Sequence, residues 1–312
     1  MKKTAFLFPG QASQYVGMAR DLFENFHSVR RLFRTASDIV GYDLADVCFN
    51  GPEDKLKQTI YTQPAVFVHS CAIVMILKQN DAVPDAAAGH SLGEYSALVC
   101  SGALSFKEAM KAVALRSSEM QKDCDDNPGA MAAVIGMDFE TVEEILKKVA
   151  GKVVSANYNS PGQVVISGET TAVEEACIRL KESGARRALT IPVGGAYHSP
   201  LMDRSAGIVS AYIDGSLDFG RFEFPVYSNV SSKPVTLAGD FKKLLSKQIS
   251  SPVLWHPIVS NMFDDGVRRF VEIGPGKVLQ GLAGKSVDDS EIDGIDTFEQ
   301  LDSFLKERVL SA

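Results

Sequence analysis

The residues Gly89-His90-Ser91-Leu92-Gly93 form a GxSxG sequence, the spacing found where a nucleophilic serine sits on a tight turn between a strand and a helix. In such a turn the small flanking residues relieve crowding around the serine. The helix that follows contributes free N–H groups and positive partial charge near the serine oxygen. The residues before the motif can form a strand and those after it a helix. The pattern predicts a nucleophilic Ser91, with an ordinary Gly-Ser turn as the alternative.

A serine hydroxyl is a poor nucleophile at neutral pH and needs a base within hydrogen-bond distance. Of the five histidines in the chain, His198 lies in a glycine-rich loop that follows an expected strand. Loops that leave a strand commonly carry functional side chains, so we predict His198 as the base. The other four histidines are expected to be structural or surface residues: His27, His69, His90 and His256.

No carboxylate stands out as the third member of a catalytic triad. Asp203 follows His198 by only five residues, which is too near for the order Ser…Asp…His of α/β hydrolases. The residues by themselves therefore predict a serine nucleophile with a histidine base. They do not select the group that orients the histidine.

Charge and composition exclude several classes of protein. The formal net charge is −7, which argues against a nucleic-acid-binding protein because phosphate binding needs a basic surface. The five cysteines are scattered and odd in number, as expected for reduced thiols in a cytoplasmic protein. The first apolar run stops at Pro9, too early for a signal sequence, and no stretch approaches the ~20 apolar residues of a membrane span. We expect a cytoplasmic protein with no membrane or nucleic-acid partner.

Strands and helices can be expected from apolar spacing over most of the chain. Residues 5–8 and 85–89 are predicted as strands, and residues 17–40, 63–79 and 92–101 as helices. A further helix over 105–121 should begin at a capping box formed by Ser105 and Glu108.

The pattern of predicted strands and helices changes over residues 130–192. Strands are predicted over 131–135, 153–157, 164–167 and 188–192, with a helix over 139–149 capped by Asp138 and another that opens at a capping box at Thr171. The resulting βαββαβ order is that of the ferredoxin-like unit. We therefore expect an α/β protein in which a ferredoxin-like small domain, residues 128–196, is inserted into a larger hydrolase-like α/β domain made of residues 1–127 and 197–312.

Several ordered motifs across nearly the whole chain resemble the malonyl-CoA:acyl carrier protein transacylase family, which includes the acyltransferase domains of fatty-acid and polyketide synthases. The motifs are Phe8-Pro-Gly-Gln11-Ala-Ser-Gln14-Tyr-Val-Gly-Met18, Thr62-Gln63-Pro64-Ala65, Gly89-His-Ser-Leu-Gly-Glu94-Tyr-Ser-Ala-Leu98, Asn157-Tyr-Asn159-Ser-Pro-Gly-Gln-Val-Val-Ile-Ser-Gly168, Gly195-Ala-Tyr-His198-Ser-Pro-Leu-Met202, Tyr227-Ser-Asn229-Val, Gln248 with Pro252-Val-Leu-Trp255, and Glu272-Ile-Gly-Pro-Gly276. The family's architecture is the one expected above. Together these motifs are far more specific than GxSxG.

The resemblance implies a role for each of several residues. Ser91 would attack the thioester of malonyl-CoA, and His198 would take its proton and return it to the leaving thiol. The phosphopantetheine thiol of an acyl carrier protein would then reverse the sequence. The backbone N–H groups of Gln11 and Leu92 would form the oxyanion hole, and the Gln248 segment would supply a backbone carbonyl that orients the histidine.

Arg116 indicates the class of substrate. By the same resemblance its guanidinium would bind the free carboxylate of malonyl through two parallel hydrogen bonds and so disfavour acetyl. Composition by itself would favour an exposed arginine on an amphipathic helix. Tyr197 precedes His198 where malonyl-preferring relatives often have phenylalanine; the aromatic ring is kept, which favours malonyl over methylmalonyl. No metal or organic cofactor is implied.

Three other functions share parts of this pattern. A serine hydrolase, either an esterase or a thioesterase, would use Ser91 and His198 with water as the acceptor and would not need Arg116. A trans-acting acyltransferase of polyketide assembly would use all three residues. A non-catalytic docking module would tolerate their loss. Because carrier proteins are usually acidic, docking on this acidic chain would require a local basic patch.

Overall fold

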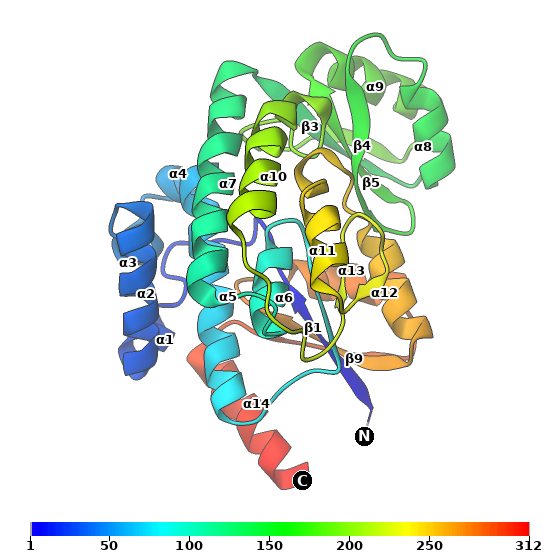
Figure 1. The fold of residues 1–312 in the computed structure, drawn as a ribbon. Helices are drawn as coiled ribbons and strands as arrows, with labels where there is room; N and C mark the ends of the chain where they lie inside the picture. Colours follow the sequence, from blue (N-terminus) through cyan, green and yellow to red (C-terminus); the bar gives the residue numbers. More distant parts are fainter. Residues whose placement is uncertain (1, 312) are drawn as a thin grey trace.

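The central sheet of the molecule has six strands in the order β10-β9-β1-β2-β7-β8, and its neighbours are parallel except for β8 against β7. The structure, a computed structural model, describes residues 2–311 (Figure 1). The strands are β1 (Lys3–Phe8), β2 (Ala86–Gly89), β7 (Val226–Tyr227), β8 (Pro234–Val235), β9 (Val267–Ile273) and β10 (Glu291–Ile295). Residues from both halves of the chain therefore meet in one sheet.

Helices cover both faces of this sheet, as a mostly parallel sheet requires. Phe6 and Phe8 of β1 pack into a core with α5, α6 and α7, whereas Ala5 and Leu7 point to the opposite side, into a core with α12 and α13. The helices of this part are α1 (Arg20–Asn25), α2 (His27–Val40), α3 (Leu44–Asn50), α4 (Glu53–Leu56), α5 (Thr59–Gln79), α6 (Gly93–Cys100), α7 (Phe106–Asp126), α10 (Asp203–Ser216), α11 (Ala238–Leu245), α12 (Trp255–Asp264), α13 (Val278–Ser286) and α14 (Phe298–Ser311), with short 3-10 turns at Pro200–Met202 and Gln248–Ser250.

A second, four-stranded antiparallel sheet lies apart from the first, at the upper right in Figure 1. Its order is β4-β5-β3-β6, with β3 (Gly129–Ile135), β4 (Val153–Ser160), β5 (Gln163–Glu169) and β6 (Arg187–Thr190). The helices α8 (Phe139–Leu146) and α9 (Thr170–Glu182) pack on it around a separate apolar core. Backbone hydrogen bonds of Val253 with Ala156 and Tyr158 connect β4 to the rest of the fold.

The predicted succession of elements is confirmed, including the βαββαβ order between Gly129 and Thr190. Two predicted caps are also confirmed, because Ser105 accepts from the N–H of Glu108 and Asp138 from that of Thr141. The capping box at Thr171 is wrong: α9 begins at Thr170 and has no side-chain cap. Thr171 therefore lies inside the first turn, where its side chain is past the capping position.

Two helices begin or end differently from the prediction. The expected helix over 17–40 is broken at Phe26, whose extended backbone, with φ −123°, separates α1 from α2. The expected helix over 63–79 begins earlier, at Thr59, so that Pro64 lies inside α5. A proline there cannot donate to the carbonyl four residues back. That carbonyl, of Ile60, instead accepts a hydrogen bond from the Tyr42 hydroxyl at 2.8 Å.

The helix α5 corrects the expectation that no stretch of the chain is long and apolar enough to span a membrane. The length and composition of α5 would suffice to cross a membrane, yet 83% of its apolar window is buried inside the fold. Its side chains contact α2, α6 and α7, so the apolar surface serves as the core of the larger sheet domain.

Candidate active site

Ser91 occupies the sharp turn between β2 and α6. Its φ is +51°, a left-handed backbone conformation that L-residues rarely adopt. The two glycines of the motif are required by space: a Cβ on Gly93 would lie 2.0 Å from the Phe8 carbonyl oxygen, and one on Gly89 would lie 1.9 Å from the carbonyl carbon of Gly93. The close approach of the turn to β1 therefore excludes side chains at Gly89 and Gly93. Ser91 lies on a strained turn between a strand and a helix, which differs from the ordinary Gly-Ser turn considered as the alternative.

His198 faces the serine. Its Nε2 lies 2.7 Å from the Ser91 Oγ, and its Nδ1 lies 3.1 Å from the carbonyl oxygen of Gln248 and 3.0 Å from that of Ser251. Since both neighbours of Nδ1 are acceptors, Nδ1 carries the hydrogen and Nε2 presents its lone pair to the hydroxyl. Burial, with smaller contributions from the charges of Arg116 and His90, lowers the pKa of His198 to about 3. The imidazole is therefore neutral and able to accept a proton.

Arg116 reaches the same oxygen from α7. Its Nη2 donates to the Ser91 Oγ at 2.9 Å and to the Gln248 Oε1 at 3.1 Å, while Nη1 donates to the Gln63 Oε1 at 2.7 Å. The side chain is 1% exposed, and burial lowers its pKa from the usual value. Within residues 2–311 it forms no salt bridge and its Nε has no hydrogen-bond partner. The sequence alternative of an exposed surface arginine is wrong, and the guanidinium offers a cation to an anionic ligand.

Three polar side chains form a layer beneath these groups. Gln248 donates from Nε2 to the backbone oxygen of Ser91 at 2.8 Å and to the Glu94 Oε2 at 2.6 Å. Asn229 accepts the backbone N–H of Ser91 at 2.7 Å and donates to the carbonyl of Gly89 at 2.6 Å. The N–H of Asn229 in turn donates to the Glu94 Oε1 at 2.7 Å. Burial raises the pKa of Glu94 to about 7.

Sequence reasoning placed Gln248 near the histidine but assigned no role to Glu94, Asn229 or Gln63. The available signal was positional: Glu94 directly follows GxSxG, on a helix whose other residues are almost all apolar or small. A carboxylate on such a helix must be buried with partners, because an unpaired charge there is costly. That argument is sufficient to select Glu94 from the sequence.

The cleft above Ser91 is also lined by Gln11 and Leu92, the two residues expected to supply backbone N–H groups. In the part of the chain that the structure describes, neither N–H donates a hydrogen bond to another protein group. Both are therefore available to an oxygen bound in the cleft. The Gln11 side chain points to Tyr197, whose hydroxyl lies 3.3 Å from its Nε2.

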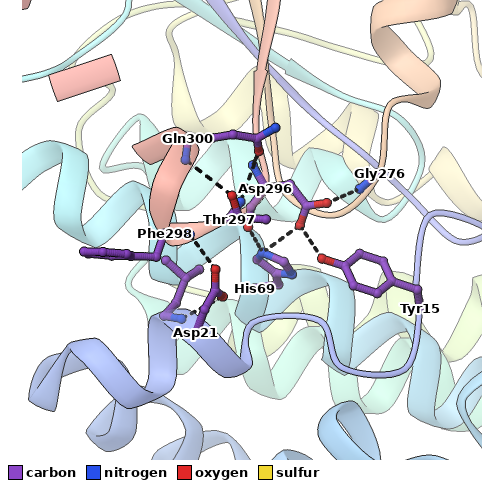
Figure 2. Close-up of polar contacts among 9 residues, drawn as sticks. Tyr15, Asp21, His69, Gly276, Asp296, Thr297, Phe298 and Gln300 are labelled. Carbon is purple, nitrogen blue, oxygen red and sulfur yellow. Dashed lines mark hydrogen bonds and ion pairs between the residues drawn. The ribbon is translucent and has the colours of Figure 1, made fainter. Parts of the chain in front are cut away.

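The loop that carries Gln11 also carries Tyr15, whose side chain is tied to the C-terminal part of the chain (Figure 2). The Tyr15 hydroxyl donates to the Asp296 Oδ1 at 2.9 Å, and the N–H of Gly276 donates to the Oδ2 at 3.0 Å. His69, which is fully buried in α5, contacts the backbone oxygen of Asp296 at 2.7 Å through its Nε2. Asp296 thus joins the Gln11 loop to the segment after β9.

Among the described residues none of the other histidines hydrogen-bonds to the Ser91 Oγ. His90 lines the same cleft, but its Nε2 lies 3.0 Å from the Asn159 Oδ1 and its ring packs against Trp255. His256 contacts Phe139, and His27 begins α2. Among residues 2–311 no group of three or more histidine, cysteine, aspartate or glutamate side chains is arranged to hold a metal ion.

Comparison with known proteins gives consistent matches. The acyl transferase domain family matches residues 5–299. The malonyl CoA-acyl carrier protein transacylase of Bacillus subtilis is 43% identical over 288 residues, which cover 91% of this chain and 90% of that protein. The protein of the same name from Haemophilus influenzae is 42% identical over 312 residues, which cover 98% of this chain and 100% of that protein.

Solved structures are similar over the same length. A malonyl-transacylase in complex with its type II PKS acyl-carrier protein is 40% identical, with a TM-score of 0.93 and coverage of 98% of this chain and 99% of that one. An acyl carrier protein S-malonyltransferase from Vibrio cholerae is 41% identical, with a TM-score of 0.92 and coverage of 97% and 99%.

Proposed function

This chain belongs to the acyl transferase domain family, and we propose that it transfers a malonyl group from malonyl-CoA to the phosphopantetheine thiol of an acyl carrier protein. One observation supports this function most strongly: His198 and the buried Arg116, which forms no salt bridge within residues 2–311, converge on the Oγ of Ser91. The serine–histidine pair can form an acyl ester, and the arginine can bind an acyl group that carries a carboxylate.

In the first half-reaction the Ser91 Oγ attacks the thioester carbonyl carbon while His198 Nε2 takes the hydroxyl proton. The carbonyl oxygen becomes an oxyanion, for which the N–H groups of Gln11 and Leu92 are the donors; each such donor is typically worth ~3 kcal/mol in the transition state. The carbon–sulfur bond then breaks. The proton on His198 passes to the leaving sulfur, so that free CoA thiol and malonyl-Ser91 are the products.

The second half-reaction reverses these steps with a different thiol. The phosphopantetheine thiol of the carrier protein gives its proton to His198, and its sulfur attacks the ester carbonyl carbon. The Ser91 oxygen leaves and recovers the proton. The histidine begins each half-reaction neutral, as its pKa of about 3 allows, and needs no carboxylate because two backbone carbonyls hold its Nδ1–H.

Arg116 selects the acyl group in this proposal. A malonyl carboxylate would take hydrogen bonds from a guanidinium that is already buried, so that little further desolvation is required. An acetyl group would leave the arginine without an anion, and a buried charge that lacks a counter-ion is unfavourable. No metal or organic cofactor enters these steps.

We also propose names for the two parts of the fold. The sheet order β4-β5-β3-β6 with two helices on one face fits a ferredoxin-like small domain over residues 128–196. The strained serine between β2 and α6, on a parallel sheet covered by helices, fits a hydrolase-like domain formed by residues 1–127 and 197–312. The cleft lies between them, since it is lined by Met131 and Asn157 as well as by Ser91.

The experiment that tests the function is intact-protein mass spectrometry after brief mixing with malonyl-CoA. We expect a malonyl mass increment on the wild-type protein that is lost on addition of a carrier protein bearing phosphopantetheine, with the malonyl group recovered on the carrier. The variant Ser91→Ala should show no increment. If malonyl-CoA is consumed to free malonate without transfer to the carrier, the protein is a hydrolase and the proposal fails.

A further inference from the structure

Glu94 is a buried carboxylate that takes no part in the reaction described above. It lies in the first turn of α6 and is 0% exposed. Its two oxygens accept different donors, Oε1 the N–H of Asn229 and Oε2 the Nε2 of Gln248. No salt bridge to it is found within residues 2–311. Burying a carboxylate without a salt bridge costs desolvation free energy. We therefore expect Glu94 to have a role other than packing.

One branch from Glu94 leads to the histidine. Gln248 holds Glu94 with its side chain, while its own backbone oxygen accepts the Nδ1–H of His198 at 3.1 Å. The same side-chain amide also donates to the backbone oxygen of Ser91 and accepts from Arg116. The position of residue 248 therefore fixes where the imidazole can point.

The other branch leads to the serine. Asn229 gives its N–H to Glu94 and uses its side chain to clamp both sides of the elbow, at the Ser91 N–H and the Gly89 carbonyl. The elbow holds an unfavourable φ of +51° at Ser91, so it depends on such contacts to keep that conformation.

We propose that Glu94 is the positioning residue for the Ser91–His198 pair, holding the serine through Asn229 and the histidine through Gln248. A catalytic triad orients its histidine with a carboxylate in direct contact. Here, among the described residues, the Nδ1 of the histidine contacts only carbonyls, and the carboxylate stands one residue further away, where it fixes both partners at once. This inference rests on the proposed acyl transfer at Ser91.

The chemistry of the two donors explains why a carboxylate is required. The Asn229 backbone and the Gln248 side chain each present an N–H donor to Glu94, and the Ser228 side chain also hydrogen-bonds to it. A carboxylate has an acceptor oxygen for each of the two N–H groups. A glutamine has one acceptor oxygen and one NH₂ group, so it must turn a donor toward a donor. The change Glu94→Gln keeps the shape of the side chain and breaks one of the two branches.

The test is the rate of malonyl-Ser91 formation at saturating malonyl-CoA, followed by rapid quench and intact mass. For Glu94→Gln we expect this rate to fall about 10- to 100-fold, as when a buried donor loses its acceptor, with KM changed less than about threefold. The fraction of folded protein should be unchanged at the assay temperature. A rate within about twofold of the wild type would overturn the proposal.

Glu272→Gln is the matched control. Glu272 is 1% exposed, and its pKa is also raised by burial to about 7. It too accepts backbone and side-chain N–H donors, from the backbones of Leu279 and Gln280 and from the Gln280 Nε2. It has no contact with Ser91, His198, Asn229 or Gln248 among the described residues. We expect its rate at saturation to stay within about twofold of the wild type. An equal fall in both variants would show a general effect of removing a buried carboxylate and overturn the proposal.

A second variant tests the serine branch with Glu94 in place. Asn229→Ala removes the clamp on the elbow but leaves the contact between Glu94 and Gln248. We expect slower ester formation while the Nδ1–H proton resonance of His198, assigned by its loss in His198→Ala, keeps its wild-type shift; in Glu94→Gln that resonance should move. An unmoved resonance in Glu94→Gln would contradict the histidine branch. Failure of the wild type to form any ester would contradict the proposed function instead.

Discussion

The guanidinium of Arg116 donates a hydrogen bond to the Oγ of Ser91 across 2.9 Å. The same oxygen lies 2.7 Å from the Nε2 of His198, so it can donate to the histidine while it accepts from the arginine. In the proposed reaction, an acyl carboxylate that binds Arg116 would therefore lie next to the Ser91 Oγ. The proposal thus places recognition of the acyl group beside the atom that would attack it.

Arg116→Ala should have different effects on ester formation from malonyl-CoA and from acetyl-CoA. We expect ester formation from malonyl-CoA to fall at least about 10-fold, because charge-assisted hydrogen bonds to the carboxylate, worth ~1.5–3 kcal/mol, are lost. Ester formation from acetyl-CoA, which has no carboxylate, should not fall. The measurement is the mass increment on Ser91 with each substrate in turn.

Arg179→Ala is the control for this change, since Arg179 pairs with Glu175 on the exposed side of α9 and should affect neither substrate. Equal losses with malonyl-CoA and acetyl-CoA in Arg116→Ala would assign the arginine to support of Ser91 and not to substrate selection.

The dependence of the rate on pH should follow Glu94 and not His198. The His198 pKa of about 3 keeps the imidazole neutral down to pH 5, whereas an ordinary histidine would be almost fully protonated there. Glu94, with a pKa raised to about 7, takes up a proton as the pH falls below 7 and then loses an acceptor for Asn229 or Gln248. We expect ester formation at saturating malonyl-CoA to slow between pH 8 and pH 5.

In Glu94→Gln the profile over the same range should be flat at its lower level. The nearest charged and titratable groups, Arg116 and Tyr95, keep one protonation state across it, since Tyr95 has a pKa of about 12. An acid limb that persists in Glu94→Gln would assign the titration to His198 and contradict its low pKa.

Glu272 should make stability depend on pH. Its pKa is raised by burial from 4.5 to about 7, so the folded state binds the proton more tightly than the unfolded state. The resulting stabilisation is complete below pH 4.5 and is lost as the pH rises through 7. Chemical denaturation of wild type and Glu272→Gln should therefore show the wild type losing stability relative to the variant, by ~1–3 kcal/mol, between pH 5 and pH 8. A constant difference over that range would contradict the raised pKa.

Asp296→Ala should slow ester formation at Ser91 although Asp296 does not contact Ser91. It removes the acceptor of Tyr15, which belongs to the loop that carries the Gln11 N–H, and of Gly276 in the segment after β9 (Figure 2). We expect a lower rate at saturating malonyl-CoA and a loss of stability of ~1–3 kcal/mol, measured by quench kinetics and denaturation. Asp293→Ala, on the adjoining strand β10 but in an exposed pair with Arg269, should change neither quantity appreciably. A normal rate in Asp296→Ala would mean that the loop holds its shape without this contact.

Gly93→Ala should disrupt the elbow. Its Cβ would lie 2.0 Å from the Phe8 carbonyl oxygen, a backbone atom that cannot move without distorting β1. We expect a loss of stability of ~3 kcal/mol or more together with loss of activity. Gly207→Ala in α10 is the control: its Cβ would have no neighbour within 4 Å, and alanine should stabilise the helix by ~0.5–1 kcal/mol. Thermal unfolding of both variants checks the prediction.

Local sequence was sufficient to predict the order of elements and to select Ser91 as the candidate nucleophile. Alternation of apolar residues and the caps at Ser105 and Asp138 act over a few residues, so they can be read without knowing the fold. The helix boundaries were less predictable. The start of α5 depends on Tyr42, which satisfies the carbonyl left free by Pro64 and lies in another part of the chain.

The sequence by itself predicted Ser91 as the nucleophile and His198 as its base, and showed that Arg116 matches the family motif. Only the tertiary structure decided that all three meet at one oxygen, because Ser91 and His198 are 107 residues apart and come together through strands from distant segments. It also decided that two carbonyls, with no carboxylate from residues 2–311, hold the Nδ1 of the histidine. Burial converts Arg116 and Glu94 from ordinary charged residues into parts of the site, since a charge gains its specific effect only where water is excluded.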